Sequence, residues 1–118
     1  MREPYGQAAT KALTHRLGRV CTSIVVVGEL WHGAEKAASD RLRKQVAALA
    51  RISVLDLKHL VEFRYTLLRT DLQRKGTPIG ANDLWIAAHA LSEWLTLVTD
   101  DEAEFSRVDG LAIKTWLR

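Results

Sequence analysis

Short apolar runs that alternate with helical segments constrain the fold of this chain most. The runs "SVLDL" (residues 53–57), "LTLVT" (95–99) and "LAIKTW" (111–116) are rich in Val, Ile and Leu, and longer segments with apolar residues at helical spacing lie between them. Apolar strands that alternate with helices are typical of α/β folds with a buried parallel sheet. We therefore expect an α/β fold with a short parallel sheet.

The amino-terminal part of the sequence predicts two helices and one strand. Apolar residues at helical spacing predict a helix over residues 7–17 that ends at Gly18, and a short strand is expected at about residues 20–22. Ser23 is suited to cap the helix that follows, "IVVVGELWHGAEKAA". The Val-rich start of that segment also permits a strand that continues through Val27.

Three further helices are expected in the rest of the chain. "SDRLRKQVAALARI" predicts a helix capped by Ser39, and "KHLVEFRYTLLRTDLQRKG" predicts a long amphipathic helix closed by Gly76. "PIGANDLWIAAHA" contains the third helix, and "DDEAEF" indicates a turn or a short helix. The buried residues expected on the first two helices are Leu42, Val46 and Leu49, and then Leu60, Phe63, Leu67 and Leu68.

Composition narrows the class of protein without identifying a function. The 118 residues suit one domain, and 47% hydrophobic with 26% charged residues is typical of globular proteins. No apolar run is long enough to cross a membrane and "MREPYGQ" is no signal peptide, so we expect a cytoplasmic location. The single Cys21 excludes an internal disulfide and lacks zinc-site spacing. The net charge of +3 permits a polyanionic partner but does not identify one.

Acidic residues interrupt apolar patterns at Glu29, at Asp83, and at the pair Asp100 and Asp101. Asp100 and Asp101 directly follow the apolar run 95–99. Ligands of parallel sheets bind beyond the carboxyl ends of the strands, so these carboxylates are expected to converge there. If its segment is helical, Asp83 lies on one stripe with Ile86, Ala87, Ala90 and Leu91.

A cluster of carboxylates needs a compensating cation, because the like charges otherwise raise their pKa values. Oxygen ligands select hard ions, so the expected cofactor is Mg²⁺ or Mn²⁺ and not zinc. Such an ion lowers the pKa of a bound water and stabilises charge that develops on a phosphate. The pattern therefore favours phosphodiester hydrolysis.

Each of these residues also has a purely structural interpretation. The macrodipole favours Asp83 in a first helical turn, Glu29 suits a solvated helix face, and the Asp pair suits a turn and an N-cap. We expect His32 and His89 to be structural and not general bases. The tryptophans indicate packing or, alternatively, a protein interface; they are Trp31, Trp85, Trp94 and Trp116.

The blocks "GELWHGA", "PIGANDLWIAAHA" and "LVTDDEAEF", in this order and spacing, resemble the VapC toxins, which are PIN-domain ribonucleases of bacterial toxin–antitoxin pairs. The resemblance implies a three-layer α/β/α fold and a metal-dependent endoribonuclease. Its catalytic and metal-binding acids would be Glu29, Asp83 and Asp101, with Asp100 the weaker candidate of its pair. The implied partners are an RNA substrate, a VapB-type antitoxin and a second copy in a homodimer.

The chain departs from this family at its beginning. VapC proteins usually start with an apolar strand that ends in Asp-Thr-Asn, which supplies the central strand and the first catalytic aspartate. Here Met1 leads directly into "REPYGQAAT". We therefore expect a single PIN-like domain over residues 1–118 that is incomplete at its amino terminus, with a sheet that is split where the central strand is missing.

Two alternatives follow from that departure and from the charge. The first is a catalytically inactive, truncated relative that binds an antitoxin or another partner chain through its Trp-bearing helices. The second is a small basic α/β module that binds nucleic acid without cleaving it, and its binding should be strongly salt-dependent.

Overall fold

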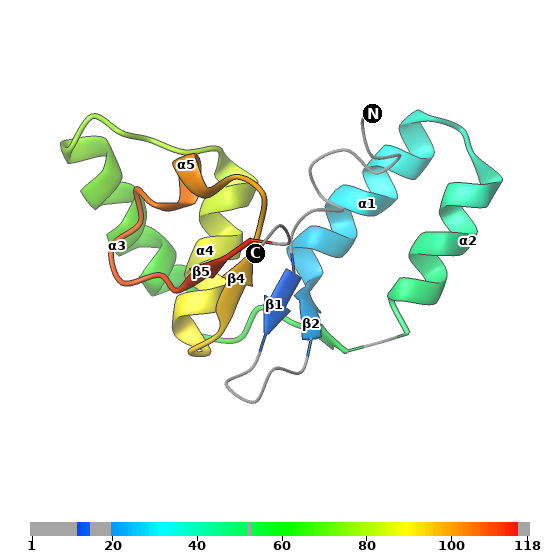
Figure 1. The fold of residues 1–118 in the computed structure, drawn as a ribbon, viewed down its shortest axis with the longest axis horizontal. Coiled ribbons are helices and arrows are strands. Elements are labelled where there is room, and N and C mark those ends of the chain that lie inside the picture. Colours follow the sequence, from blue (N-terminus) through cyan, green and yellow to red (C-terminus); the bar gives the residue numbers. More distant parts are fainter. Residues whose placement is uncertain (1–11, 15–19, 52, 116–118) are drawn as a thin grey trace.

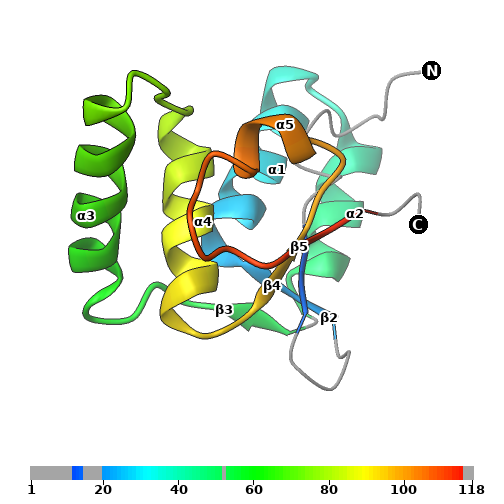
Figure 2. The same cartoon turned by 60° about the vertical axis from the view of Figure 1, so that its left-hand side comes forward.

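The computed structural model describes residues 12–14, 20–51 and 53–115 of the chain. Within them, five strands form one sheet with helices on both sides (Figures 1 and 2). The strands are β1 (Ala12–Thr14), β2 (Val20–Ser23), β3 (Val54–Leu55), β4 (Thr96–Val98) and β5 (Ile113–Lys114). The helices are α1 (Ile24–Lys36), α2 (Asp40–Leu49), α3 (Val61–Arg74), α4 (Ala81–Ser92) and α5 (Glu102–Phe105). The predicted α/β fold is confirmed.

The sheet is mixed, whereas the sequence predicted a parallel one. Its strand order is β3-β2-β1-β4-β5. The outer pairs, β2 with β3 and β4 with β5, are parallel as expected. The central strand β1 runs antiparallel to both of its neighbours. Helices α1 and α2 lie on one side of the strands and α3 and α4 on the other (Figure 1).

Two sequence-based predictions are wrong at strand β1. Residues 12–14 were expected to be helical, and they form the centre of the sheet instead, while the rest of the predicted helix lies outside the described residues. Leu13 is fully buried and pairs with Cys21 on β2 and Leu97 on β4. Pairing on both sides outweighs local helix propensity. The predicted split is therefore also wrong, because β1 joins the two halves of the sheet.

Two serines begin the helices on the β2 side as predicted. Ser23 Oγ accepts a hydrogen bond from the backbone N–H of Val25 at 3.1 Å, so α1 starts directly after β2 and the alternative of a longer strand is wrong. Ser39 Oγ accepts from the N–H of Leu42 at 3.2 Å and caps α2. Leu42 and Val46 are buried as expected, while Leu49, also expected there, is only half-buried.

Helix α3 buries a different face from the one predicted. Leu68 is buried, but Phe63 and Leu67 are 61% and 48% exposed. Leu60 precedes the helix with a left-handed φ of 88° and is also exposed. The face that packs inward carries Val61, Leu68 and Leu72, spaced i, i+7 and i+11. The helix ends before Gly76, whose φ of 71° suits glycine, as predicted.

Helix α4 is the most buried helix of the described chain and packs against α3 on one side and contacts α1 and β4. Its six buried residues run from Leu84 to Ala90 with only Trp85 half-buried among them. Such a helix is held rigidly, which suits a segment that carries functional side chains. No helix among the described residues combines the length and the apolar character needed to cross a membrane.

Candidate active site

Three of the helices meet the sheet at the edge where β2 and β4 end. Helix α1 follows β2 directly, and α5 follows β4 after a turn. Helix α4 begins at the same edge, beside α5 (Figure 1). The acids predicted for the site therefore come from segments that start at one edge of the sheet, as the rule for strand carboxyl ends anticipates.

Asp101 has a defined structural role at this edge. Its Oδ1 accepts a hydrogen bond from the N–H of Glu104 at 3.2 Å, which caps α5. Its own N–H donates to Thr99 Oγ1 at 3.0 Å, and Thr99 is fully buried. The structural interpretation of Asp101 as an N-cap is thus confirmed, and its side chain is held in one place. The neighbouring Asp100 is exposed.

Glu104 brings the acids of α4 and α5 together. Its Oε1 accepts a hydrogen bond from the N–H of Gly80, the N-cap residue of α4, at 3.1 Å. Burial raises the pKa of Glu104, and the neighbouring Asp83 and Asp101 carboxyls raise it further, while the Gly80 N–H opposes them. A carboxyl with a raised pKa between two other carboxyls marks a cluster in which negative charge is crowded.

The Gly80 backbone lies directly against this cluster. A Cβ atom placed on Gly80 would be 3.9 Å from both Asp83 Oδ2 and Glu104 Oε1. The two carboxylate oxygens therefore flank one point at the start of α4. We did not predict Glu104 from the sequence, although Asp101 and Glu104 stand in the spacing of a capping box, D-x-x-E, which was the available signal.

Glu29 lies in the middle of α1, which contacts α4, and its side chain is half-buried. Within residues 12–14, 20–51 and 53–115, no group of three or more acidic, histidine or cysteine side chains is placed so that it could hold a metal ion. The donor chemistry at the edge is nevertheless that of a hard-ion site, because all its side-chain donors are carboxylates. Mg²⁺ commonly uses one or two carboxylates and keeps several of its waters.

His89 is structural, as predicted. It is fully buried, its Nδ1 lies 2.8 Å from Ser23 Oγ, and its Nε2 lies 2.8 Å from Glu93 Oε2. Glu93 also forms a salt bridge of 3.3 Å with Lys58. This network connects the start of α1 to the end of α4, so it fixes two helices of the candidate site. His32 is exposed.

The tryptophans divide between packing and exposure. Trp85 stacks on Tyr65 of α3 with ring centroids 3.9 Å apart. Trp94 is 87% exposed and Trp31 is 37% exposed, as a protein interface requires. Trp116 lies outside the described residues.

Comparisons with known proteins identify the family. A family model described as "PIN domain" matches residues 2–111. The chain is 36% identical over 104 residues to ribonuclease VapC2 of Haemophilus influenzae, an alignment that covers 85% of this chain and 77% of the relative. It is 37% identical over 100 residues to the tRNA(fMet)-specific endonuclease VapC of Salmonella typhimurium, covering 83% and 76%.

A solved structure gives the same answer for the fold. The crystal structure of DNA-bound VapBC from Salmonella typhimurium matches with a TM-score of 0.77 and 39% identity, over 81% of this chain and 74% of that chain. Sequence and fold thus agree over most of the chain. The chain therefore belongs to the PIN-domain family and, within it, to the VapC toxins of VapBC toxin–antitoxin systems.

Proposed function

We propose that this chain is a metal-dependent endoribonuclease that hydrolyses RNA phosphodiester bonds as the toxin of a toxin–antitoxin pair. Its similarity to a ribonuclease and to a tRNA(fMet)-specific endonuclease supports the reaction class. The observation that carries the proposal is the placement of the Asp83 and Glu104 carboxylates on either side of the Gly80 backbone, with Asp101 at the start of α5 next to Glu104.

In this proposal Mg²⁺ or Mn²⁺ is bound by Glu29, Asp83 and Asp101, and Asp100 is a weaker candidate ligand. Because no three such donors among the described residues are placed to hold an ion together, one or two of these carboxylates bind it directly and the others through its water molecules. We add Glu104 to the set, because its carboxyl lies between those of Asp83 and Asp101. An oxygen-only donor set with excess negative charge fits a hard divalent cation. When bound, such an ion lowers the pKa of a water molecule and stabilises the charge that develops on the phosphate.

The chain's own groups prepare the site for a phosphodiester. The hydrogen bond from Gly80 N–H to Glu104 ties the start of α4 to α5, so Asp83 and Asp101 keep a fixed separation. The amino terminus of the 12-residue α4 presents the positive end of its dipole at the same place, and Gly80 caps it without a side-chain hydrogen bond. Once a cation offsets the charge of the carboxylates, this end of the helix also favours a phosphate.

The protein partners in this proposal are a VapB-type antitoxin and a second copy of the chain. A relative crystallised as a VapBC complex supports the first. Exposed large apolar side chains support the binding of protein partners in general. They include Ile24 and Trp31 on α1, Leu60, Phe63 and Leu67 at α3, and Trp94 after α4.

One observation favours a second candidate function, in which the chain is catalytically inactive and binds its partners only. The central strand β1 consists of Ala12, Leu13 and Thr14, so this described strand brings no carboxylate to the site. In the VapC pattern the central strand supplies the first catalytic aspartate. Activity would then depend on the acids of α1, α4 and α5 alone.

The deciding experiment is Mn²⁺-dependent cleavage of a mixture of structured RNAs by this chain and by Asp83→Asn, after circular dichroism has established that both are folded. Asn keeps the size of Asp83 but removes the charge that a hard cation needs. We expect cleavage to fall on the order of 100-fold or more, because even second-shell changes cost about 10–100-fold. The matched control is Asp56→Asn, at an exposed position next to β3.

A folded parent that cleaves no RNA, yet binds an antitoxin, would favour the inactive alternative. Cleavage that Asp83→Asn leaves at the level of Asp56→Asn would contradict the assignment of Asp83.

A further inference from the structure

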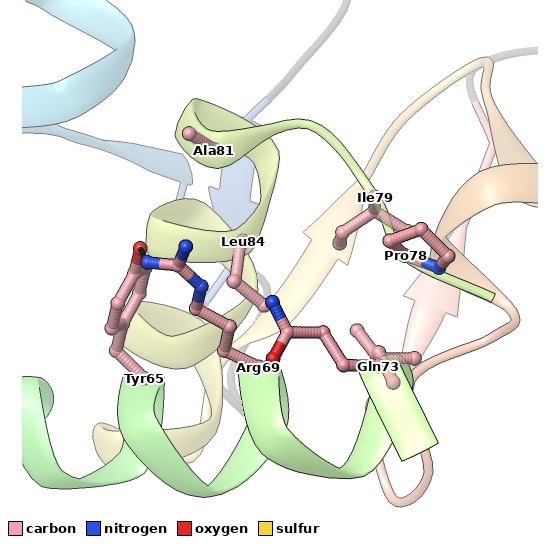
Figure 3. Close-up of a pocket in the computed structure, with 8 residues that line it drawn as sticks. Tyr65, Arg69, Gln73, Pro78, Ile79, Ala81 and Leu84 are labelled. Carbon is pink, nitrogen blue, oxygen red and sulfur yellow. Dashed lines mark hydrogen bonds between the residues drawn. The ribbon is translucent and has the colours of Figure 1, made fainter. Parts of the chain in front are cut away.

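A cavity between α3 and α4 lies beside the candidate active site, and none of the acids of that site lines it. It has a volume of about 170 Å³. Its wall is made by α3, by the segment that leads into α4, and by the first turn of α4 (Figure 3). The lining residues are Tyr65, Arg69, Leu72, Gln73, Pro78, Ile79, Ala81 and Leu84.

The cavity has an apolar floor and a polar rim. Leu72 and Leu84 are buried and form the floor, whereas Arg69 and Gln73 are exposed at the rim. A cavity of about 150 Å³ holds a benzene molecule. The volume here therefore admits one six-membered aromatic ring, and the second ring of a purine would extend to the polar groups of the rim.

Arg69 is held in place for such a contact. Its Nη1 donates a hydrogen bond to Tyr65 Oη at 3.2 Å, and Tyr65 is in turn fixed by its stack on Trp85. Because Tyr65 is a neutral acceptor, this hydrogen bond leaves the charge of Arg69 available to a ligand. A guanidinium that is fixed before binding loses less entropy when a ligand binds.

The cavity and the candidate site share one piece of backbone. Pro78 and Ile79 line the cavity, and the next residue, Gly80, donates its N–H to Glu104. Arg107 donates to the carbonyl oxygen of Pro78 at 3.2 Å, which ties this wall to the residues after α5. The wall is thus anchored on the side of the acids.

Helix geometry places Asp83 close to the cavity but on a neighbouring face. Leu84 lines the cavity, and Asp83 precedes it by one residue, which is about 100° around an α-helix. The two faces are separated by no more than the helix width, about 10 Å. A short stretch of single-stranded RNA that crosses the start of α4 can therefore reach both.

We propose that this cavity binds one unpaired base of the RNA substrate, next to the scissile phosphate, and that Arg69 and Gln73 read its edge. The proposal rests on the proposed ribonuclease function, which supplies the reason for RNA to lie beside Asp83. Sequence-specific RNA recognition commonly takes an unpaired base into a pocket and hydrogen-bonds its edge. Arg69 offers two parallel donors along one edge of its guanidinium, so it favours guanine, whose O6 and N7 are two adjacent acceptors on one edge of the base.

The test measures binding without cleavage, in the Asp83→Asn background and with EDTA present. The probes are two fluorescein-labelled single-stranded RNA octamers, one of uridines only and one with a single guanosine among uridines, followed by fluorescence anisotropy. We expect Arg69→Ala to weaken binding of the guanosine octamer about tenfold and to leave the uridine octamer unchanged. Gln73→Ala should act in the same direction. Arg64→Ala is the matched control, an exposed arginine of α3 outside the cavity lining.

Three results would overturn the base pocket. Equal weakening of both octamers by Arg69→Ala would make Arg69 a phosphate contact. If Arg69→Ala and Arg64→Ala bind the guanosine octamer with equal affinity, the cavity takes no part in RNA binding. A change in molar mass by light scattering in Arg69→Ala alone would make the cavity an interface between copies of the chain.

The failure of this proposal is distinguishable from failure of the proposed function. Base selectivity is measured without metal and without turnover, whereas the ribonuclease assignment depends on cleavage with Mn²⁺. A chain that cleaves RNA and loses no guanosine selectivity in Arg69→Ala keeps its function and loses the pocket.

Discussion

The β1–β2 pair and the α4–β4–α5 segment show two ways in which a sequence determines structure. In α4, buried residues follow each other at helical spacing within 12 residues, so the pattern is local. In β1, three residues owe their place to partners elsewhere, since Leu13 pairs with Cys21 and with Leu97. A local pattern can be recognised from the sequence alone, whereas a pairing with distant residues cannot.

The residues of the candidate site and the residues that hold the sheet together differ in the same way. The acids of the candidate site come from α1, α4 and the turn into α5, and α1 and α5 begin with side-chain caps that the sequence encodes locally. The central strand carries no acid and contributes Leu13 to the core. The segment that was hardest to predict is therefore the one that holds the two halves of the sheet together.

Leu13→Ala should have the largest effect on stability. Its side chain is fully buried in the core and its strand pairs on both sides, so truncation leaves a cavity against the centre of the sheet. We expect unfolding in urea to show a loss of about 2–5 kcal/mol. Val20→Ala is the control, because Val20 on β2 is 57% exposed. Similar losses for both variants would mean that β1 is not the central strand.

Several helix ends could be predicted from the sequence because a single residue determines where each helix starts or stops. Ser23 and Ser39 cap their helices through side-chain hydrogen bonds, and Gly76 ends α3 with a positive φ. The buried face of α3 could not be predicted in the same way. Phe63 and Leu67 are as apolar as the residues that are buried, so hydrophobicity alone could not choose between two faces of the helix.

The candidate site could be predicted in part for the same reason. Asp83 and Asp101 stand out because they interrupt or follow apolar runs, and the structure brings both to Glu104. Glu104 itself looks like a surface residue of a four-residue helix. Its contact with Gly80, 24 residues away, is visible only once α4 and α5 are folded together.

The β1–β2 pair and the α4–β4–α5 segment are joined by a hydrogen bond between Ser23 and His89. Ser23 ends β2, His89 belongs to α4, and their side chains lie 2.8 Å apart in the core. His89→Ala leaves Ser23 and Glu93 with an unmade hydrogen bond each, and we expect it to cost about 2–3 kcal/mol. A double-mutant cycle with Ser23→Ala should give a coupling of about 0.5–3 kcal/mol.

His32→Ala, at an exposed position, is the control for that cycle, and it should change the free energy of unfolding little. Additive costs for Ser23→Ala and His89→Ala would contradict the network, and the two regions would then be coupled by packing alone.

Two substitutions at Asp101 distinguish its role as the N-cap of α5 from its proposed role as a metal ligand. Asp101→Ala removes the hydrogen bond to the Glu104 N–H and should cost about 1 kcal/mol in thermal or urea unfolding. Asp101→Ser keeps a capping oxygen but loses the carboxylate, so it should stay within a few tenths of the parent stability. Both variants should lose Mn²⁺-dependent cleavage. Full cleavage by Asp101→Ser would reduce Asp101 to a cap.

The smallest effect is expected from the pH dependence at Glu104, measured in metal-free buffer. Its pKa in the folded chain is raised above the ordinary 4.5, first by burial and then by Asp83 and Asp101. Between the unfolded and folded pKa values the folded chain binds more protons than the unfolded chain, so its stability falls as the pH rises through that window. Glu104→Gln cannot ionise and keeps an oxygen for the Gly80 N–H.

The melting temperature of Glu104→Gln should therefore exceed that of the parent at pH 7, and the difference should vanish below about pH 4, where Glu104 is protonated in both states. The increase should be small, because solvent screens a carboxyl that is only half-buried. Glu35→Gln supplies the opposite sign, since a hydrogen bond and ion pair with Arg43 lower the pKa of Glu35. Glu104→Gln could instead melt at a lower temperature than the parent at pH 7. The hydrogen bond from Gly80 N–H to the Glu104 carboxylate would then stabilise the fold more than the repulsion between Glu104 and Asp83 destabilises it.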